Sequence, residues 1–178
     1  DNAAGSPYPS DIAVSGLSGN VTKVTVDLTG IAHTFPDDID ILLVGPGGQN
    51  AIIMSDAGGG GDVTGINLTL DSTAATVLPD NPAALTSGTF QPANYAGSGG
   101  EAWPAPAPAP AGGSALTVFN GSAPNGTWSL YVVDDEGQDT GTISGGWALR
   151  ITTDTCGPTP TATNTFTPTV TPTGTPAP

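Results

Sequence analysis

The sequence predicts an all-β protein: a jelly-roll-like β-sandwich of about eight strands, followed by an extended Thr/Pro C-terminal tail. The first observation is that short segments alternate apolar with polar residues, as half-buried strands do. The second is that Gly, Pro and Asp separate these segments, as in turns. The third is that no segment has a convincing helical pattern. Strands that each bury one face pack most simply as two facing sheets.

The expected strands follow one another closely along the chain. Val24, Val26 and Leu28 alternate with polar residues, and the alternation returns at 39–43 after an acidic turn. The run 45–48, Gly-Pro-Gly-Gly, is expected to form a hairpin-like turn into the next strand. The segments expected as strands are 12–17, 24–29, 39–43, 49–55, 66–70, 115–119, 128–132 and 147–151.

Two tryptophans each begin an apolar alternation near the end of the predicted domain. Trp128 precedes Leu130 and Val132, and Trp147 precedes Leu149 and Ile151, at every second position. Residues with this spacing point to the same face of a strand. We therefore expect both tryptophans to be core residues on adjacent strands rather than ligand platforms.

The composition divides the chain into one domain and its flanks. Residues 1–10 are expected to form a lead-in, 11–155 the sandwich and 156–178 the Thr/Pro-rich tail. Within the sandwich, 79–113 is a Pro/Gly/Ala-rich stretch that is expected to be a long surface loop. It carries Tyr95 and Trp103, whose rings are expected to pin the loop to the sandwich; ligand binding is the alternative.

The charge balance excludes some classes of partner. The chain of 178 residues has only two basic residues against 16 acidic ones, a formal net charge of −14. Binding nucleic acid or an anionic membrane needs clustered Lys and Arg, so neither is expected as a partner. No run of 18 apolar residues occurs, so no membrane insertion is expected. The weakly charged polar surface and a start at Asp1 rather than Met predict a secreted, extracellular or cell-surface protein.

Three segments together resemble a known family. They are H-T-F-P-D-D-I-D-I-L-L-V-G-P-G-G at 33–48, N-G-T-W-S-L-Y-V-V-D-D at 125–135, and G-G-W-A-L-R-I at 145–151. From about Ile12 to Thr153 the chain resembles the P domain, the β-sandwich that follows the catalytic domain in kexin- and furin-type proprotein convertases and many bacterial subtilases. The resemblance implies a sandwich without a catalytic triad.

The residues themselves also predict a protein that is not an enzyme. His33 is the one histidine, and the sequence has no G-x-S-x-G elbow and no cysteine near it. The resemblance places this histidine outside the subtilase catalytic domain. We expect His33 to be a hydrogen-bonded structural residue at the start of a strand.

Acidic loops predict a Ca²⁺ site, because Ca²⁺ takes six to eight oxygen ligands and almost no basic side chain is present to neutralise the carboxylates. Asp37 and Asp38 precede one strand, and an acidic turn contains Asp135 and Asp139. A second candidate loop is bracketed by Asp56 and Asp62. The alternative is that these side chains cap turns and face water. Bacterial P-domain-like modules support Ca²⁺ by resemblance.

Several residues are candidates for covalent modification. N-glycosylation sequons begin at Asn20, Asn67, Asn120 and Asn125. O-linked sugar is expected on the tail, at Thr161, Thr163, Thr165 and Thr167. Cys156 is the single cysteine, so it is either free or bridged to another molecule.

Two classes of function remain open from the sequence. In the first, the protein is a non-catalytic structural subunit of an extracellular filament, sheath or surface coat. It would assemble with copies of itself as its tail lies along a neighbour, burying Phe166 and Val170, with Cys156 available to lock the contact. In the second, it is an accessory module of a secreted subtilisin-like protease or other exported hydrolase, and the tail is a linker.

Overall fold

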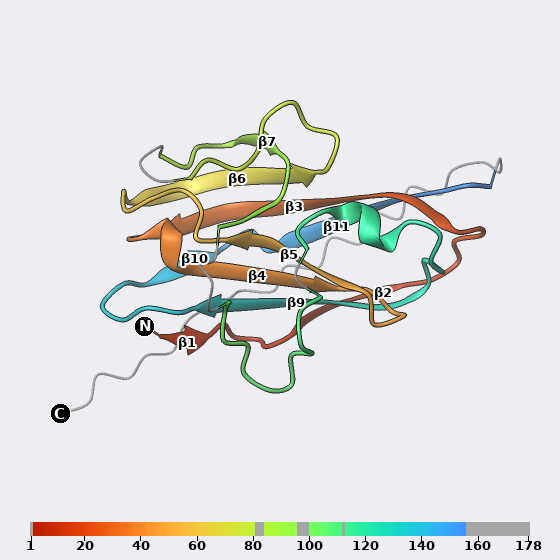
Figure 1. The fold of residues 1–178 in the computed structure, drawn as a ribbon, viewed down its shortest axis with the longest axis horizontal. Helices are drawn as coiled ribbons and strands as arrows, with labels where there is room; N and C mark the ends of the chain where they lie inside the picture. Colours follow the sequence, from red (N-terminus) through yellow and green to blue (C-terminus); the bar gives the residue numbers. More distant parts are fainter. Residues whose placement is uncertain (1, 81–83, 96–99, 112, 156–178) are drawn as a thin grey trace.

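The computed structural model describes residues 2–80, 84–95, 100–111 and 113–155, which form a sandwich of two sheets (Figure 1). The all-β fold predicted from the sequence is confirmed. The predicted tail at 156–178 lies outside the described residues.

The first sheet is centred on two long neighbouring strands. Strand β9 (Gly126–Asp134) pairs antiparallel with β4 (Ile39–Val44) and, on its other side, with both β1 (Ala3–Ala4) and β2 (Ser10–Val14). Strand β4 continues through a tight turn into β5 (Asn50–Ser55), and β8 (Ala93–Asn94) closes that edge. The turn is held by the Gly48 N–H bond to the Gly45 carbonyl, as the Gly-Pro-Gly-Gly motif predicts.

The second sheet is centred on β3 (Val21–His33). On one side β3 pairs with β6 (Val63–Asp71), which in turn pairs with β7 (Gly88–Phe90). On its other side β3 pairs with β10 (Gly141–Ile143) and then with β11 (Trp147–Thr153). Two short 3₁₀ helices complete the described elements: η1 (Pro36–Asp38) and η2 (Leu116–Phe119).

Two details of the predicted strands differ from the structure. Eleven strands form in the described residues where about eight were expected, because β1, β7, β8 and β10 are only two or three residues long. The expected strand at 115–119 is wrong, since this segment forms η2. Its buried residues, Leu116 and Phe119, are three positions apart, which is the period of a 3₁₀ helix rather than of a strand.

Both tryptophans are in the core, with side chains almost fully buried. The expectation that they lie on adjacent strands is wrong. Trp128 belongs to β9 in the first sheet, whereas Trp147 belongs to β11 in the second. The indole N–H of Trp128 donates to the Pro124 carbonyl, and that of Trp147 donates to the Ser10 hydroxyl. They therefore contribute to the core from opposite sheets.

Strand β4 is buried on both faces, which is unusual for a strand of an antiparallel sandwich. Ile39, Ile41 and Leu43 point into the core between the sheets. Leu42 lies on the outer face, in a second apolar cluster with Ile52 and Tyr131.

This outer face is covered by residues 100–111, which we call the strap. Trp103 and Ala107 of the strap pack against the second cluster, together with Tyr8. The ring of Tyr8 meets that of Tyr131 edge-on, with centroids 5.0 Å apart. The structure thus has Trp103 holding the loop to the sandwich, as expected, and the Tyr95 hydroxyl donates to the Leu78 carbonyl.

Among the described residues, no helix has the length and apolar character needed to cross a membrane.

Candidate metal centre

Asp40 is a carboxylate inside a buried strand. It is the second residue of β4 (Ile39–Val44), on the outer face beside Leu42, and only 2% of its surface is exposed. Its Oδ2 atom has no hydrogen-bond partner within the described part of the chain. A buried ionised carboxylate normally needs a counter-charge or several donors, so this oxygen requires an explanation.

Two further carboxylates converge on Asp40. Glu101 is at the start of the strap, and Asp135 immediately follows β9, the strand paired with β4. One oxygen from each of the three side chains lies within 4.8 Å of the others. Asp40 is buried, while Glu101 and Asp135 are half-buried. Hydrogen bonding between β4 and β9 therefore fixes two of the groups, and the strap brings the third.

Electrostatics at this triad favour the uncharged carboxyl groups when no cation is bound. Burial, and then the charge of Glu101, raise the pKa of Asp40 to about 9. Burial also raises the pKa of Glu101, against a side-chain hydrogen bond with Asp40, and the nearby charge of Asp56 adds to the increase. Burial and the charge of Asp56 raise the pKa of Asp135, against a side-chain hydrogen bond with Glu101. Each ionised group thus makes it harder to ionise the next.

A hard divalent cation is the group that fits these three side chains. Two oxygens bound to one Ca²⁺ at about 2.4 Å from it can be separated by at most about 5 Å, which matches the spacing of the triad. All donors are carboxylate oxygens, with neither histidine nor cysteine among them, so the site suits Ca²⁺ or Mg²⁺ better than softer metals. Carbonyl groups and water would complete the coordination.

The predicted Ca²⁺ ligands are only partly brought together. Asp135 belongs to the triad, and Asp56, which accepts a hydrogen bond from the Ser55 hydroxyl at 3.1 Å, lies close enough to affect the pKa of Glu101 and Asp135. Asp37 lies beside the glycine-rich loop after β5, where its side chain accepts a hydrogen bond from the Gly59 N–H at 3.3 Å. Its pKa is raised by burial and by the charges of Asp56 and Asp80, against the effect of the Gly59 bond.

The other predicted ligands are not members of the triad, although the Asp38 carbonyl accepts a hydrogen bond from the Asp135 N–H at 3.1 Å. Burial and then the charges of Asp134 and Asp139 raise the pKa of Asp38 to about 6, so Asp38 faces a neighbouring acidic group. Asp139 accepts a hydrogen bond from the Thr34 hydroxyl at 2.8 Å, and this bond stabilises the turn that contains Asp139. Asp62 is exposed to solvent.

Sequence reasoning missed two of the three triad residues. Asp40 stands within the alternating strand 39–43, at an outward position where a polar residue is unremarkable. Asp40 can be recognised as a buried candidate ligand only once the strap is known to cover that face. Glu101 is the only charged residue of the strap, which is otherwise built from Ala, Pro, Gly and Trp103. A single charged residue in an otherwise uncharged loop could have been identified from the sequence as a candidate ligand.

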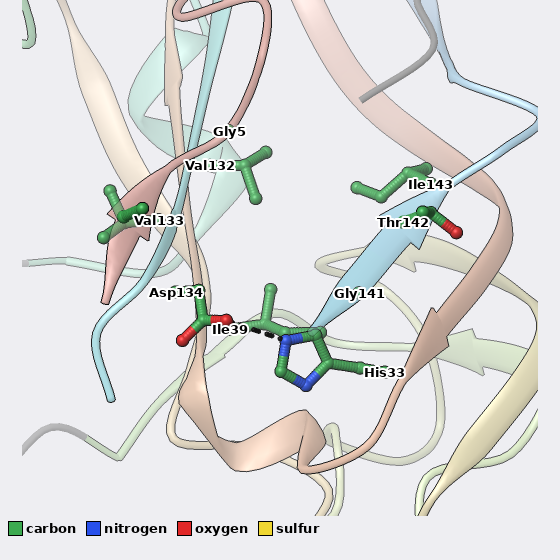
Figure 2. Close-up of a pocket in the computed structure, with 10 residues that line it drawn as sticks. Gly5, His33, Ile39, Val132, Val133, Asp134, Gly141, Thr142 and Ile143 are labelled. Atoms are coloured by element: carbon green, nitrogen blue, oxygen red, sulfur yellow. Dashed lines mark hydrogen bonds and ion pairs between the residues drawn. The ribbon is translucent and has the colours of Figure 1, made fainter. Parts of the chain in front are cut away.

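His33 is the last residue of β3, not the first residue of a strand as expected. Its Nδ1 accepts a hydrogen bond from the Phe35 N–H at 3.1 Å, which leaves the ring proton on Nε2, 3.3 Å from Asp134 Oδ2 (Figure 2). A Cβ atom at Gly141 would overlap the ring, so glycine is needed there for the close approach of β10. The Nδ1 bond fixes the local turn after β3, and the Nε2 contact joins the ends of β3 and β9.

The imidazole of His33 and the carboxylate of Asp134 line a small cavity between the sheet ends (Figure 2). Its volume is about 40 Å³, and Val132 and Ile143 stand on opposite sides of it. A space of this size holds a few water molecules at most, not an organic substrate.

The predicted glycosylation sites differ in their surroundings. Both ends of the Asn125 amide are bonded to the backbone of Leu17, so this side chain is engaged in the fold. Asn67 accepts from the Gly30 N–H, and Asn20 donates to Asp154 at 3.4 Å. Asn120 is exposed at the end of η2. The predicted modification and assembly residues of the tail lie outside the described residues: Cys156, Thr161, Thr163, Thr165, Phe166, Thr167 and Val170.

Comparisons with known proteins do not assign the chain to a family. No protein-family model matches it, and neither a curated protein nor a solved structure matches it.

Proposed function

We propose that this protein is a non-catalytic β-sandwich module that binds a divalent cation, Ca²⁺ in the first instance, and acts as a structural protein outside the cell. The main support for cation binding is the buried carboxyl group of Asp40. Its Oδ2 accepts no hydrogen bond among the described residues, and it faces Glu101 and Asp135. A bound cation would neutralise all three groups at once.

The charge of the whole chain supports the same proposal. With two basic residues against 16 acidic ones, a protein counter-charge for the triad is scarce. Lys23 is engaged with Asp71 at 2.7 Å and Arg150 with Asp27 at 2.6 Å, and both pairs lie on the second sheet. Extracellular fluids commonly provide the cation that these residues do not.

The non-catalytic part of the proposal is supported by the surroundings of His33. His33 is 5% exposed, its ring nitrogens are occupied by Phe35 and Asp134, and the adjoining cavity is too small for a substrate. The sequence resemblance to P domains supports a module that accompanies or replaces an enzyme rather than one that catalyses.

Titration with Ca²⁺ tests the cation directly. The full chain, stripped with EDTA and dialysed, should bind about one Ca²⁺ per triad by isothermal titration calorimetry and should show sensitised Tb³⁺ luminescence. Asp135→Asn should weaken both signals, whereas Asp62→Asn, which removes an exposed carboxylate, should leave them unchanged. Absence of any binding heat and of Tb³⁺ luminescence in the wild-type chain rejects the proposal.

The role in assembly is the second part of the proposal. Strand β11 is at the edge of the second sheet and ends at Thr153, just before the Thr/Pro-rich tail. An edge strand offers unpaired backbone groups that a neighbouring chain can extend. We propose that copies of the chain associate through the tail into a filament, sheath or coat; the competing proposal is an accessory module of a secreted hydrolase. Electron microscopy of native material distinguishes polymers from isolated monomers.

A further inference from the structure

The strap, residues 100–111, is attached to the first sheet differently at its two ends. At its far end, Asn50 of β5 accepts a hydrogen bond from the Ala111 N–H at 2.8 Å and donates one to the Ala109 carbonyl at 3.4 Å. Just beyond, the Ile52 N–H donates to the Gly113 carbonyl at 3.0 Å. This end is therefore tied to β5 by ordinary hydrogen bonds.

The near end of the strap, residues 100–104, is attached mainly through side chains. The Tyr8 hydroxyl donates to the Pro104 carbonyl at 3.1 Å. Trp103 packs on the second apolar cluster, yet its indole N–H is buried without a hydrogen-bond partner in the described residues. A buried donor without an acceptor opposes this closed position.

Glu101 is a further contact of the near end, and without a cation it joins carboxyl groups to one another alone. Its carboxylate faces those of Asp40 and Asp135, both held by the paired strands β4 and β9. Whenever two of these groups are ionised together, like charges at this distance in a half-buried site repel each other. A divalent cation would strengthen this contact, because it would bind the strap carboxylate and the two sheet carboxylates together.

We propose that the bound cation is a clasp that holds the near end of the strap closed, so that loss of the cation exposes the apolar face around Leu42, Ile52 and Tyr131. The proposal rests on cation binding at the triad and adds a consequence for the loop. Only one of the three ligands is on the strap, so the cation would add a link between the strap and the first sheet. In Figure 1 the strap is the green segment that loops beneath β9.

Tryptophan quenching measures this opening in the intact chain. Trp128 and Trp147 are 0% and 3% exposed in the core, whereas Trp103 is half-buried, so acrylamide should mainly reach Trp103. We expect EDTA to increase quenching severalfold relative to excess Ca²⁺. In Trp103→Phe this calcium-dependent difference should disappear.

Hydrogen exchange locates the change along the chain. Amides at 100–103 should exchange faster in EDTA than in Ca²⁺, while the Ala111 amide, bonded to Asn50, should change little. In Glu101→Gln, both quenching and exchange should lose their response to Ca²⁺. Asp62→Asn should keep the wild-type response.

Two results overturn the clasp in different ways. If Ca²⁺ binds by calorimetry but neither quenching nor exchange at 100–103 changes, the site exists and the clasp is wrong. The clasp is also wrong if Glu101→Gln retains a full calcium-dependent opening. If calorimetry detects no binding at all, the proposed function fails and the clasp fails with it.

Discussion

The carboxyl group of Asp40, the second residue of the buried strand β4, lies within 4.8 Å of that of Glu101, on the loop that covers this strand. The two residues are separated in sequence by two further strands of the fold, β5 and β6, and by the short strands β7 and β8. The covering loop buries a carboxyl group that would otherwise be solvated. The stability of the protein should therefore depend on what neutralises these carboxylates.

Calcium should stabilise the folded protein. A ligand that binds only the folded state at 100 times its Kd stabilises it by about 2.7 kcal/mol, which for a domain of this size is a Tm increase of about 5–10 °C. Differential scanning calorimetry in EDTA and in excess Ca²⁺ measures the shift. Superimposable melts, together with no metal by elemental analysis, would end this idea.

The metal-free protein should lose stability as the pH rises. The pKa of Asp40 is raised to about 9 and that of Asp38 to about 6, both far above the unfolded value of about 3.9. Between these limits the folded state binds more protons than the unfolded state, so the free energy of unfolding falls with increasing pH. Asp71, whose pKa is lowered mainly through Lys23 despite the opposing effect of burial, acts the other way only at acidic pH.

Melts in EDTA at pH 5 and pH 8 test this dependence. We expect the higher Tm at pH 5, and a smaller difference when Ca²⁺ is present, because the cation replaces the protons. A metal-free protein that is more stable at pH 8 would contradict the assignment of raised pKa values at the triad.

The variant Asp40→Asn should show how much of the effect of Asp40 on stability and Ca²⁺ binding comes from its charge rather than from its shape. The amide has the same outline without a charge to bury, so in EDTA at pH 8 the variant should melt at or a few degrees above wild type, and its dependence on pH should flatten. It should also lose most of the Ca²⁺-induced shift. The exposed Asp62→Asn is the matched control. A variant that keeps the full Ca²⁺ shift would show that Asp40 is not a ligand.

Trp128→Ala should destabilise the sandwich severely. The ring is fully buried, contacts Phe119 with centroids 5.0 Å apart, and bonds to the Pro124 carbonyl. Replacing a core tryptophan by alanine costs about 3–5 kcal/mol, a fall in Tm of roughly 10 °C or more. Thermal melts followed by circular dichroism measure it. A variant that melts like wild type would mean that β9 does not have the register described.

Removal of residues 158–178 should abolish assembly and leave the sandwich folded. Burying Phe166 against a neighbour contributes about 1.5–3 kcal/mol per contact, so Phe166→Ala should weaken assembly without changing the Tm. Electron microscopy and sedimentation compare the full and truncated chains, and Val118→Ala, an exposed residue of the sandwich, serves as the control substitution. Equal polymerisation by the truncated chain would favour the accessory-module function.

The strands could be predicted from the sequence because the alternation of apolar and polar residues within each strand indicates which of its faces is buried. Alternation in 24–29, 39–43 and 128–132 shows which side chains need burial, and this requirement is met within a few residues along the chain. The same logic located Trp128 and Trp147 in the core. It also located the Gly-Pro-Gly-Gly turn, where the sequence determines the backbone directly.

The pairing of strands and the composition of the site were decided by the tertiary structure. Trp128 and Trp147 carry the same local pattern, yet they belong to opposite sheets, because partner choice depends on contacts far apart in sequence. Only Asp135 of the predicted ligands joins the triad, and Asp40 and Glu101 complete it. From the sequence, an aspartate on the outward face of a strand is expected to be solvated. It becomes buried only when another segment of the chain covers that face. Burial by a distant loop leaves no periodic trace in either segment, so only the folded chain brings these carboxylates together.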